Sequence, residues 1–276
     1  MKNQNVTEFS WSKNEVKILQ ISDIHLFATQ SQSLLGICCW NSFQAVLEQI
    51  KNDKQDFDFI VISGDISQDD SPESYKLFVS AIEQNFNKPV FWIAGNHDVS
   101  ELLAEHLNQK PFENSKKIIT PNWQILLLNS QVVGAAYGKL ADEEMHFVAE
   151  SLALNPNLAT LIFVHHNSIP VGCEWLDQHC MKNGAEFLSL LSKHQNVKAV
   201  ICGHVHQEIE QNHEGIKIIS TPSTCIQFKP NCKEFTLDEL QPAYRYINLT
   251  ATGNFVTEVK RLKGKEFLPN MQAQGY

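Results

Sequence analysis

The chain lacks an excess of positive charge, a long apolar run and the sequence pattern of a signal peptide in its first ten residues. Its 276 residues hold 22 Lys and Arg against 31 Asp and Glu, a formal net charge of −9. Proteins that bind nucleic acid or anionic membranes usually carry the opposite balance. No apolar stretch approaches the roughly 20 residues of a membrane span, and residues 1–10 lack the apolar core of a signal peptide. We therefore expect a cytoplasmic protein that binds neither nucleic acid nor membrane.

Paired cysteine motifs are also missing. The seven cysteines are an odd number, with no Cys-x-x-Cys pair and no zinc-ribbon spacing. We interpret them as reduced residues that mostly contribute to packing.

Short apolar runs alternate with segments of helical period, which predicts a layered α/β architecture. With 43% apolar residues, the chain can bury a large core. Ser71 followed by Pro72 predicts the start of a helix. Strands are expected at 16–21, 59–62, 90–94, 125–128, 161–164 and 199–202, and further helices at 40–50, 142–154 and 184–191.

From about residue 207 the chain becomes β-rich. Strands are expected at 216–220, 244–249 and 255–259, the last two forming a hairpin. No linker or charge block divides the sequence, so we expect one domain over residues 1–276. Weak symmetry between its halves suggests two sheets packed face to face with helices outside, a four-layer sandwich.

Five clusters rich in His and Asp follow the predicted strands. In chain order they are Asp23-Ile24-His25, Gly64-Asp65, Gly95-Asn96-His97-Asp98, His165-His166 and Gly203-His204-Val205-His206. Each lies at the carboxyl end of an expected strand, where α/β sheets place ligands. Glycines before three of the clustered side chains allow the tight turns that would bring them inward.

The clustered side chains are suited to binding metal. Asp23 and His25 are two residues apart, so at a strand end they point to the same side and could hold one cation. His204 and His206 repeat this spacing. Mixed oxygen and imidazole ligands suit Mn²⁺, Fe²⁺ or Zn²⁺ better than Ca²⁺ or Mg²⁺. A carboxylate such as Asp65 can bridge two ions, which lie ~3.5–4 Å apart in two-metal hydrolases.

Each cluster alone also has a simpler interpretation. Asp-x-His occurs often by chance, and Gly-Asp is frequently only a turn. Gly-Asn-His-Asp could cap a helix beginning near Ser100, and the two histidine pairs could be packed or hydrogen-bonded strand ends. Five such clusters, all at strand ends, leave coincidence as a minor alternative.

The order and content of the clusters resemble the calcineurin-like metallophosphoesterase superfamily, whose pattern is Asp-x-His, Gly-Asp, Gly-Asn-His-(Asp or Glu), His and Gly-His-x-His. The resemblance implies two packed mixed β-sheets flanked by helices, and two divalent ions, with Fe²⁺ or Mn²⁺ first and Zn²⁺ as the third candidate. It assigns one ion to Asp23, His25, Asp65 and His206, and the other to Asp65, Asn96, His165 and His204.

Segments between the clusters resemble the bacterial class III 3′,5′-cyclic AMP phosphodiesterases. They are residues 18–21 with 25–27, 123–128, 172–173 with 175–179, and 221–225 with 227–230. The chain departs from close relatives after the ligand histidine: they often continue with two histidines and a proline, whereas His166 is followed here by Asn167 and Ser168. The resemblance implies hydrolysis of cyclic AMP to 5′-AMP, which would lower cellular cyclic AMP.

His97 is expected to take part in catalysis. It follows the ligand Asn96, so it can face the phosphate without binding metal and protonate the departing 3′ oxygen. Asp98 is the second expected catalytic residue: it could orient His97, or instead place a charge at a helix N-terminus. The residues expected to contact substrate are His25, Asp65, Asn96, His97 and His206.

Recognition of the base is less determined by the sequence. Trp175, Phe228 and His179 could stack on the adenine or rim it, although an aromatic residue more often belongs to a core. Rival functions are another metallophosphoesterase, acting on phosphoprotein, nucleic acid, another cyclic nucleotide or a nucleotide pyrophosphate, and a non-catalytic scaffold of this fold. The scaffold reading is disfavoured because every ligand position is filled.

Overall fold

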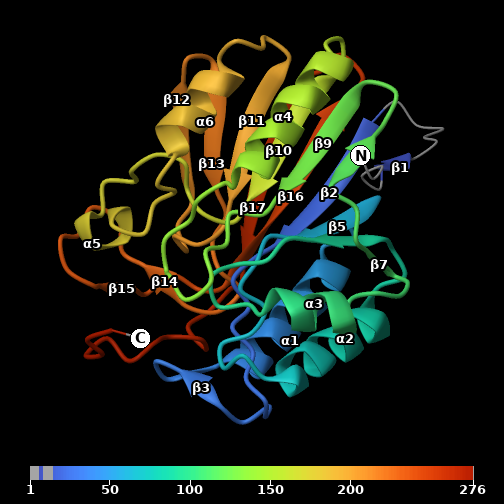
Figure 1. Ribbon diagram of the computed structural model, residues 1–276. Coiled ribbons are helices and arrows are strands. Elements are labelled where there is room, and N and C mark those ends of the chain that lie inside the picture. Colours follow the sequence, from blue (N-terminus) through green and yellow to red (C-terminus); the bar gives the residue numbers. More distant parts are fainter. Residues whose placement is uncertain (1–5, 9–14, 276) are drawn as a thin grey trace.

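Two mixed β-sheets form the centre of the computed structural model, which describes residues 6–8 and 15–275 (Figure 1). The first has six strands in the order β17 (Phe255–Arg261), β16 (Ala243–Thr250), β2 (Glu15–Ile21), β5 (Phe59–Ile62), β6 (Val90–Trp92) and β7 (Phe112–Glu113). The second has seven in the order β1 (Val6–Glu8), β8 (Lys117–Ile119), β9 (Trp123–Leu128), β10 (Ala159–Val164), β11 (Val197–Cys202), β13 (Ile216–Ser220) and β12 (Ile209–His213).

Helices cover the outer face of each sheet. Figure 1 shows α4 (Asp142–Leu154) and α6 (Gly184–Leu191) over the seven-stranded sheet. The helices α1 (Cys39–Asn52), α2 (Pro72–Asn85) and α3 (Ser100–His106) gather in the lower part of the view, against the six-stranded sheet. Shorter elements are α5 (Glu174–Asp177) and two hairpin-like pairs, β3 (Ser33–Leu34) with β4 (Ile37–Cys38) and β14 (Gln227–Phe228) with β15 (Leu237–Asp238).

Alternating burial along the strands creates these layers. In β5, Phe59 and Val61 pack between the two sheets, whereas Ile60 and Ile62 pack toward the helices on the other side. Successive side chains of a strand point to opposite faces, so a fully apolar strand must be covered on both. A separate apolar cluster joins the seven-stranded sheet to α4 and α6. The predicted sandwich of two mixed sheets flanked by helices is confirmed.

Local signals in the sequence set several boundaries. The hydroxyl oxygen of Ser71 accepts a hydrogen bond from the backbone N–H of Ser74 at 3.2 Å, and Pro72 is the first residue of α2. This is the expected cap and first-turn proline. The predicted helices at 142–154 and 184–191 match α4 and α6, and the predicted hairpin matches β16 and β17.

The β-rich end of the chain does not form a layer of its own. β16 pairs antiparallel with β2, placing Ile247 opposite Ile18, and β17 becomes the edge of that sheet. β13 pairs with β11 in the other sheet. Both sheets therefore contain strands from the first and last thirds of the chain. Within the described residues, no helix has the length and apolarity needed to cross a membrane.

Candidate metal centre

The five polar clusters meet at one place, although they are far apart in the sequence. They lie on the loops that follow β2, β5, β6, β10 and β11. The carboxyl ends of these strands come to the same edge of the paired sheets, as expected for ligands of α/β proteins. The structure thus brings all seven predicted ligands together.

One group of ligand atoms surrounds Asp23. Its Oδ1 lies 3.3 Å from Nε2 of His206, and that nitrogen lies 3.2 Å from Nε2 of His25. The His25 nitrogen is in turn 4.0 Å from Oδ2 of Asp65. All four side chains are at most 1% exposed. Carboxylate and imidazole atoms at these separations can converge on one cation.

A second group shares Asp65 with the first. Nε2 of His165 lies 3.2 Å from Oδ2 of Asp65 and 3.2 Å from Oδ1 of Asn96. The ring of His204 is 5.2 Å from that of His165, measured between centroids. Asp65 therefore stands between two sets of ligand atoms, as a bridging carboxylate must.

Hydrogen bonds from outside the two groups fix the orientation of three imidazoles. Nδ1 of His25 lies 2.6 Å from Oε1 of Gln68, and Nδ1 of His165 lies 2.7 Å from the carbonyl oxygen of Ser63. Nδ1 of His206 is 3.0 Å from the carbonyl oxygen of Ile226. A carbonyl oxygen can only accept, so each Nδ1 must donate. In the neutral form of each ring the Nε2 lone pair then faces the centre, an arrangement typical of metal-binding histidines.

The backbone is strained where the ligands occur. Five of them have positive φ angles, a conformation that costs energy for residues other than glycine: Asp23 at 53°, His25 at 55°, Asp65 at 53°, His204 at 63° and His206 at 49°. Strain of this kind persists where surrounding structure enforces a functional geometry.

Two glycines allow the loops to approach one another closely. A Cβ at Gly64 would lie 2.3 Å from Nδ1 of His165, and Gly64 itself has a φ of 99°. A Cβ at Gly95 would lie 2.1 Å from Oδ1 of Asp65. Neither position can hold a side chain without displacing a predicted ligand.

Burial and close charges shift the pKa values of several side chains in the centre. Burial lowers the pKa of His25 to about 3. Although burial alone would lower the pKa of His165, the adjacent Asp65 carboxylate raises it to about 9. The pKa of Asp65 is well below its ordinary value: burial raises it, but the charges of His165 and His97 outweigh that effect. The buried Asp65 carboxylate and the His165 imidazole thus favour each other's charged form.

Within the described part of the chain, one predicted ligand atom lacks the hydrogen bond that a buried polar atom normally makes. Nε2 of His204 is buried and has no hydrogen-bond partner among the described residues. Burying such a nitrogen unpaired is costly, whereas coordination would satisfy it. The residues present therefore fit a pair of divalent ions.

Asp98 joins two loops of the centre. Its carboxylate accepts hydrogen bonds from the backbone N–H groups of Gly95 at 2.9 Å and Ile66 at 3.0 Å, and from the hydroxyl of Tyr75 at 3.2 Å. Burial and the charge of Asp65 raise the pKa of the Asp98 carboxyl to about 7. These contacts couple the loop after β5 to the loop after β6, so Asp98 positions the residues around it.

His97 lies at the open side of the centre. Its backbone N–H donates to Oδ1 of Asp65 at 2.8 Å, and its ring is 5.2 Å from that of His25. Its ring nitrogen is also near enough to His25 and Asp65 to be considered a ligand. The half-buried side chain lines a cavity, as a group that reaches substrate must.

His166, the second histidine of its pair, lies against the ligands, and a ring nitrogen of His166 is close enough to those of His165 and His204 for the three to hold a metal ion. Its Nδ1 lies 2.7 Å from the hydroxyl oxygen of Ser130, and its ring is 4.6 Å from that of His204. Sequence reasoning did not find the roles of Ser130 or Gln68. Neither residue lies in one of the clusters, so no sequence pattern around them predicted a contact with the ligand histidines.

Two cavities border the centre from different sides. The first, which we call the base-side cavity, has a volume of about 430 Å³, and its floor is formed by Asn96, His97 and His204. The second, which we call the charged cavity, has a volume of about 630 Å³ and reaches His206.

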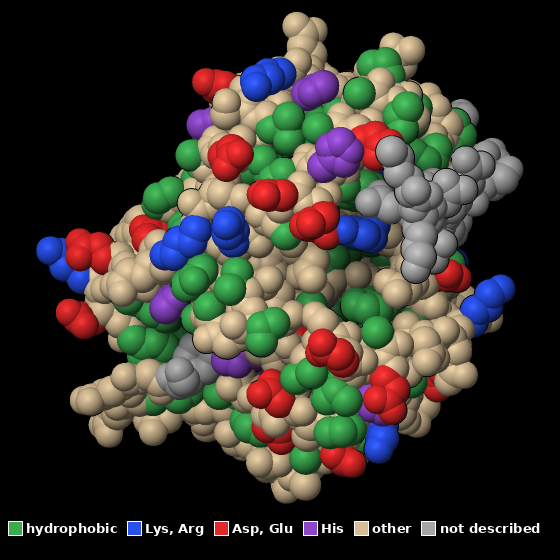
Figure 2. Space-filling model, in the orientation of Figure 1, with side chains coloured by type: hydrophobic (Ala, Val, Ile, Leu, Met, Phe, Trp, Pro, Cys, Tyr) green, Lys and Arg blue, Asp and Glu red, His purple; other side chains and the backbone are tan. Residues whose placement is uncertain are grey.

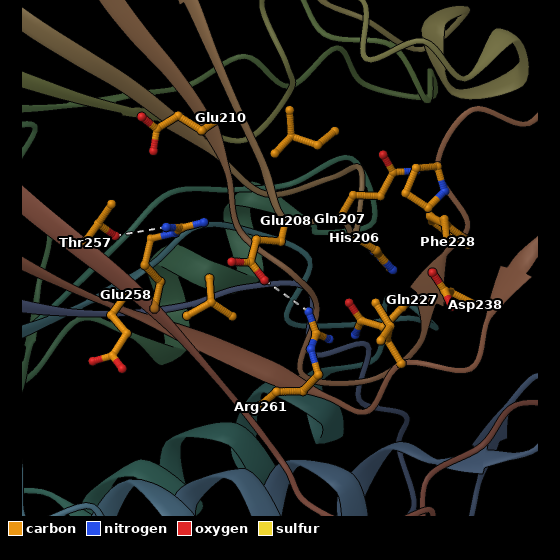
Figure 3. A pocket seen from close by; sticks show the side chains of 15 residues that line it. His206, Gln207, Glu208, Glu210, Gln227, Phe228, Asp238, Thr257, Glu258 and Arg261 are labelled. Carbon is orange, nitrogen blue, oxygen red and sulfur yellow. Dashed lines mark hydrogen bonds and ion pairs between the residues drawn. The ribbon is translucent and has the colours of Figure 1, made fainter.

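Figure 3 shows the charged cavity with acidic side chains around it: Glu208, Glu210, Asp238 and Glu258. Its two arginines are already engaged, Arg245 with Thr257 at 2.9 Å and Arg261 with Glu208 at 3.5 Å. An anionic phosphodiester would meet net negative charge there. The base-side cavity is therefore the better candidate for substrate, despite its smaller size.

The sequence model of the family described as calcineurin-like phosphoesterase matches residues 16–208, which carry all seven predicted ligands. This chain belongs to that family. The matched region ends just after Gly203-His204-Val205-His206 and leaves the β-rich end of the chain outside it.

Relatives within the family match over nearly the whole chain. It is 45% identical over 274 residues to a protein of Haemophilus influenzae named 3′,5′-cyclic adenosine monophosphate phosphodiesterase CpdA, covering 99% of this chain and 100% of the relative. It is 42% identical over 262 residues to the protein of that name from Escherichia coli, covering 95% of each. A dimetal phosphatase from Danio rerio shares the fold, with a TM-score of 0.61, 15% identity, and coverage of 88% of this chain and 98% of that structure.

Proposed function

We propose that this protein is a two-metal phosphodiesterase that hydrolyses 3′,5′-cyclic AMP to 5′-AMP and so lowers cellular cyclic AMP. The observation that carries this proposal is the 45% identity, over 99% of the chain, to a protein named for that activity. The converging ligand groups around Asp65 supply the matching chemistry.

In this proposal the seven ligands divide between two ions. Asp23, His25, Asp65 and His206 would hold one, and Asp65, Asn96, His165 and His204 would hold the other. Mn²⁺ and Fe²⁺, with Zn²⁺ as a third candidate, fit this donor set. When bound, such an ion pair supplies the positive charge that activates water and stabilises the phosphoryl oxygens.

The remaining steps are assigned to this chain's own side chains. His97 donates a hydrogen bond to the phosphate and protonates the departing 3′ oxygen. Asp98 keeps the loop that carries His97 in place through its contacts with Gly95 and Ile66. The residues around the phosphate are His25, Asp65, Asn96, His97 and His206.

The setting we propose is the cytoplasm, with the chain acting as one domain. All seven cysteines are free thiols, and the Sγ atoms of Cys39 and Cys225 lie 3.5 Å apart without a bond. Free thiols in such proximity are typical of a reducing compartment. Strands from both ends of the chain share each sheet, which favours a single unit. Figure 2 shows acidic and basic side chains interspersed on the face drawn, in keeping with a small-molecule substrate.

The test is a substrate panel with Mn²⁺ supplied: cyclic AMP, cyclic GMP, a phosphopeptide and single-stranded DNA. We expect cyclic AMP to have the highest kcat/KM and the purified protein to bind two ions per chain. The Asp65→Asn variant should lose both activity and metal, whereas Asp56→Asn, the same change at an exposed site, should lose neither. Preference for the phosphopeptide or DNA would favour a different metallophosphoesterase, and absence of metal and activity would favour a scaffold.

A further inference from the structure

The base-side cavity combines a polar floor with apolar walls. Asn96, His97 and His204 form the floor, beside the metal centre. Trp175, Leu176 and Phe235 belong to the walls. Sites for small ligands commonly have this composition, with a few polar groups to orient the ligand and apolar surface to enclose it. A volume of about 430 Å³ lies in the usual range for such sites.

A connected set of aromatic rings holds one wall in place. The ring of Trp175 meets Phe235 at 5.0 Å and 67°, and meets Phe228 at 4.9 Å and 86°. Phe228 stacks on His206, with centroids 4.5 Å apart and planes 13° from parallel. Aromatic contacts of this geometry are individually favourable. The position of Trp175 is therefore fixed relative to a predicted metal ligand.

Another part of the lining is a loop with small side chains. Lys139 N–H donates to the carbonyl oxygen of Ser130 at 2.9 Å and closes the loop at its base. The Gln131 amide donates to the carbonyl oxygen of Gly95 at 2.7 Å, which ties the loop to the metal centre. Ala135 and Ala136 face the cavity from this loop. Their short side chains leave a space beside the aromatic wall.

None of the described residues that line the base-side cavity is Lys, Arg, Asp or Glu. Burial and nearby Lys182 lower the pKa of His179, which favours its neutral form. A ligand whose phosphate lay at the metal centre would thus place an uncharged part in this cavity. Among the uncharged parts of a nucleotide, only the base has a planar aromatic face that can stack on Trp175 or Phe235.

We infer that the base-side cavity is the subsite for the purine base, in which Trp175 and Phe235 form the stacking surface and the Ala135–Ala136 loop closes the other side. The inference rests on the proposed function, because it takes a cyclic nucleotide as the substrate. Stacking on an aromatic side chain contributes about 1–3 kcal/mol per base, equivalent to roughly 5- to 150-fold in binding.

The experiment compares ligands that differ only in the base. With Mn²⁺-loaded protein, kcat/KM is measured for cyclic AMP and for the 3′,5′-cyclic phosphate of 1-deoxyribose. In parallel, calorimetry gives the Kd of 5′-AMP and of ribose 5-phosphate. The wild type should prefer the base-containing ligand in both pairs by about tenfold or more.

The variants test which residues produce that preference. Trp175→Ala and Phe235→Ala should each reduce it by about fivefold or more, whereas Trp175→Phe should retain most of it, because a stacking ring remains. Trp40→Ala, at a half-buried tryptophan on α1, is the matched control and should keep the wild-type preference. Two independent alanine variants guard against misfolding of either one.

The outcomes separate the two proposals. Equal affinity of the wild type for 5′-AMP and ribose 5-phosphate would overturn the base subsite. A wild-type preference that survives in both alanine variants would also overturn it. If the wild type hydrolysed neither cyclic phosphate, the proposed function would fail, while the binding comparison would still decide whether the cavity takes a base.

Discussion

Replacing His97 with alanine is the change that best separates catalysis from metal binding in this centre. Asn96, His165 and Asp65 approach one another closely without it. The hydrogen bond that His97 makes to Oδ1 of Asp65, at 2.8 Å, comes from its backbone N–H and so survives the substitution. The variant should therefore keep both ions while losing the imidazole that faces the cavity.

The expected loss depends on the leaving group. Removing a general acid costs about 10²- to 10⁴-fold in kcat, equivalent to roughly 2.7–5.4 kcal/mol in the activation barrier. The 3′ alkoxide of cyclic AMP needs a proton to depart. A nitrophenolate does not, so bis(p-nitrophenyl) phosphate should lose less than about fivefold.

The assay measures kcat for both substrates and metal content by elemental analysis, in wild type, His97→Ala and the control His146→Ala. His146 is exposed on α4 and belongs to none of the clusters, so its removal should change neither quantity. Equal losses on the two substrates would refute the role of His97 as proton donor. A drop to one ion per chain would show instead that His97 is a ligand, as its proximity to His25 and Asp65 permits.

Three further substitutions test the surroundings of the centre. Gln68→Ala removes the group that accepts the hydrogen bond from His25 Nδ1–H. Metal affinity, measured by competition with a chelator, should weaken by about 10- to 100-fold. Unchanged affinity would contradict the role of Gln68 in orienting His25. Tyr75→Phe removes a buried hydroxyl that hydrogen-bonds with Asp98 and with the backbone of Val99. The free energy of unfolding, measured by urea titration, should fall by about 1–3 kcal/mol. A loss below about 0.5 kcal/mol would show that water replaces the missing hydroxyl. Gly138→Ala would place a Cβ 2.4 Å from the ring of His166, so we expect both a lower Tm and a lower kcat. Wild-type values of Tm and kcat would mean that the loop carrying residue 138 can move aside.

Much of the architecture could be predicted because the buried face of each helix or strand requires apolar residues at regular spacing along the sequence. The apolar run 59–62 matches β5, and the helical periods of 142–154 and 184–191 match α4 and α6. Ser71 and Pro72 marked the start of α2 because capping depends on neighbours within three residues. These features involve only local chain, so the local sequence is sufficient.

The candidate ligands were also predictable, since each cluster follows a strand and contains side chains suited to metals. Their supporting residues were not. Gln68 and the Ile226 carbonyl group contact ligands from outside the clusters, and Phe235 reaches the base-side cavity 60 residues after Trp175. The sequence left two roles open for Asp98, and the structure shows its carboxylate joining loops through Gly95 and Ile66.

The sequence by itself determined the types of element, the polar clusters at their ends and, through the family pattern, the chemistry of the site. Tertiary structure alone decided that β16 lies beside β2 and that His25 and His206, 181 residues apart, place their nitrogens 3.2 Å from each other. It also decided which of the two cavities beside the metal centre has no Lys, Arg, Asp or Glu in its described lining. The physical reason is that periodicity and capping act over a few residues, whereas strand pairing and the meeting of loops depend on how all the buried faces pack together.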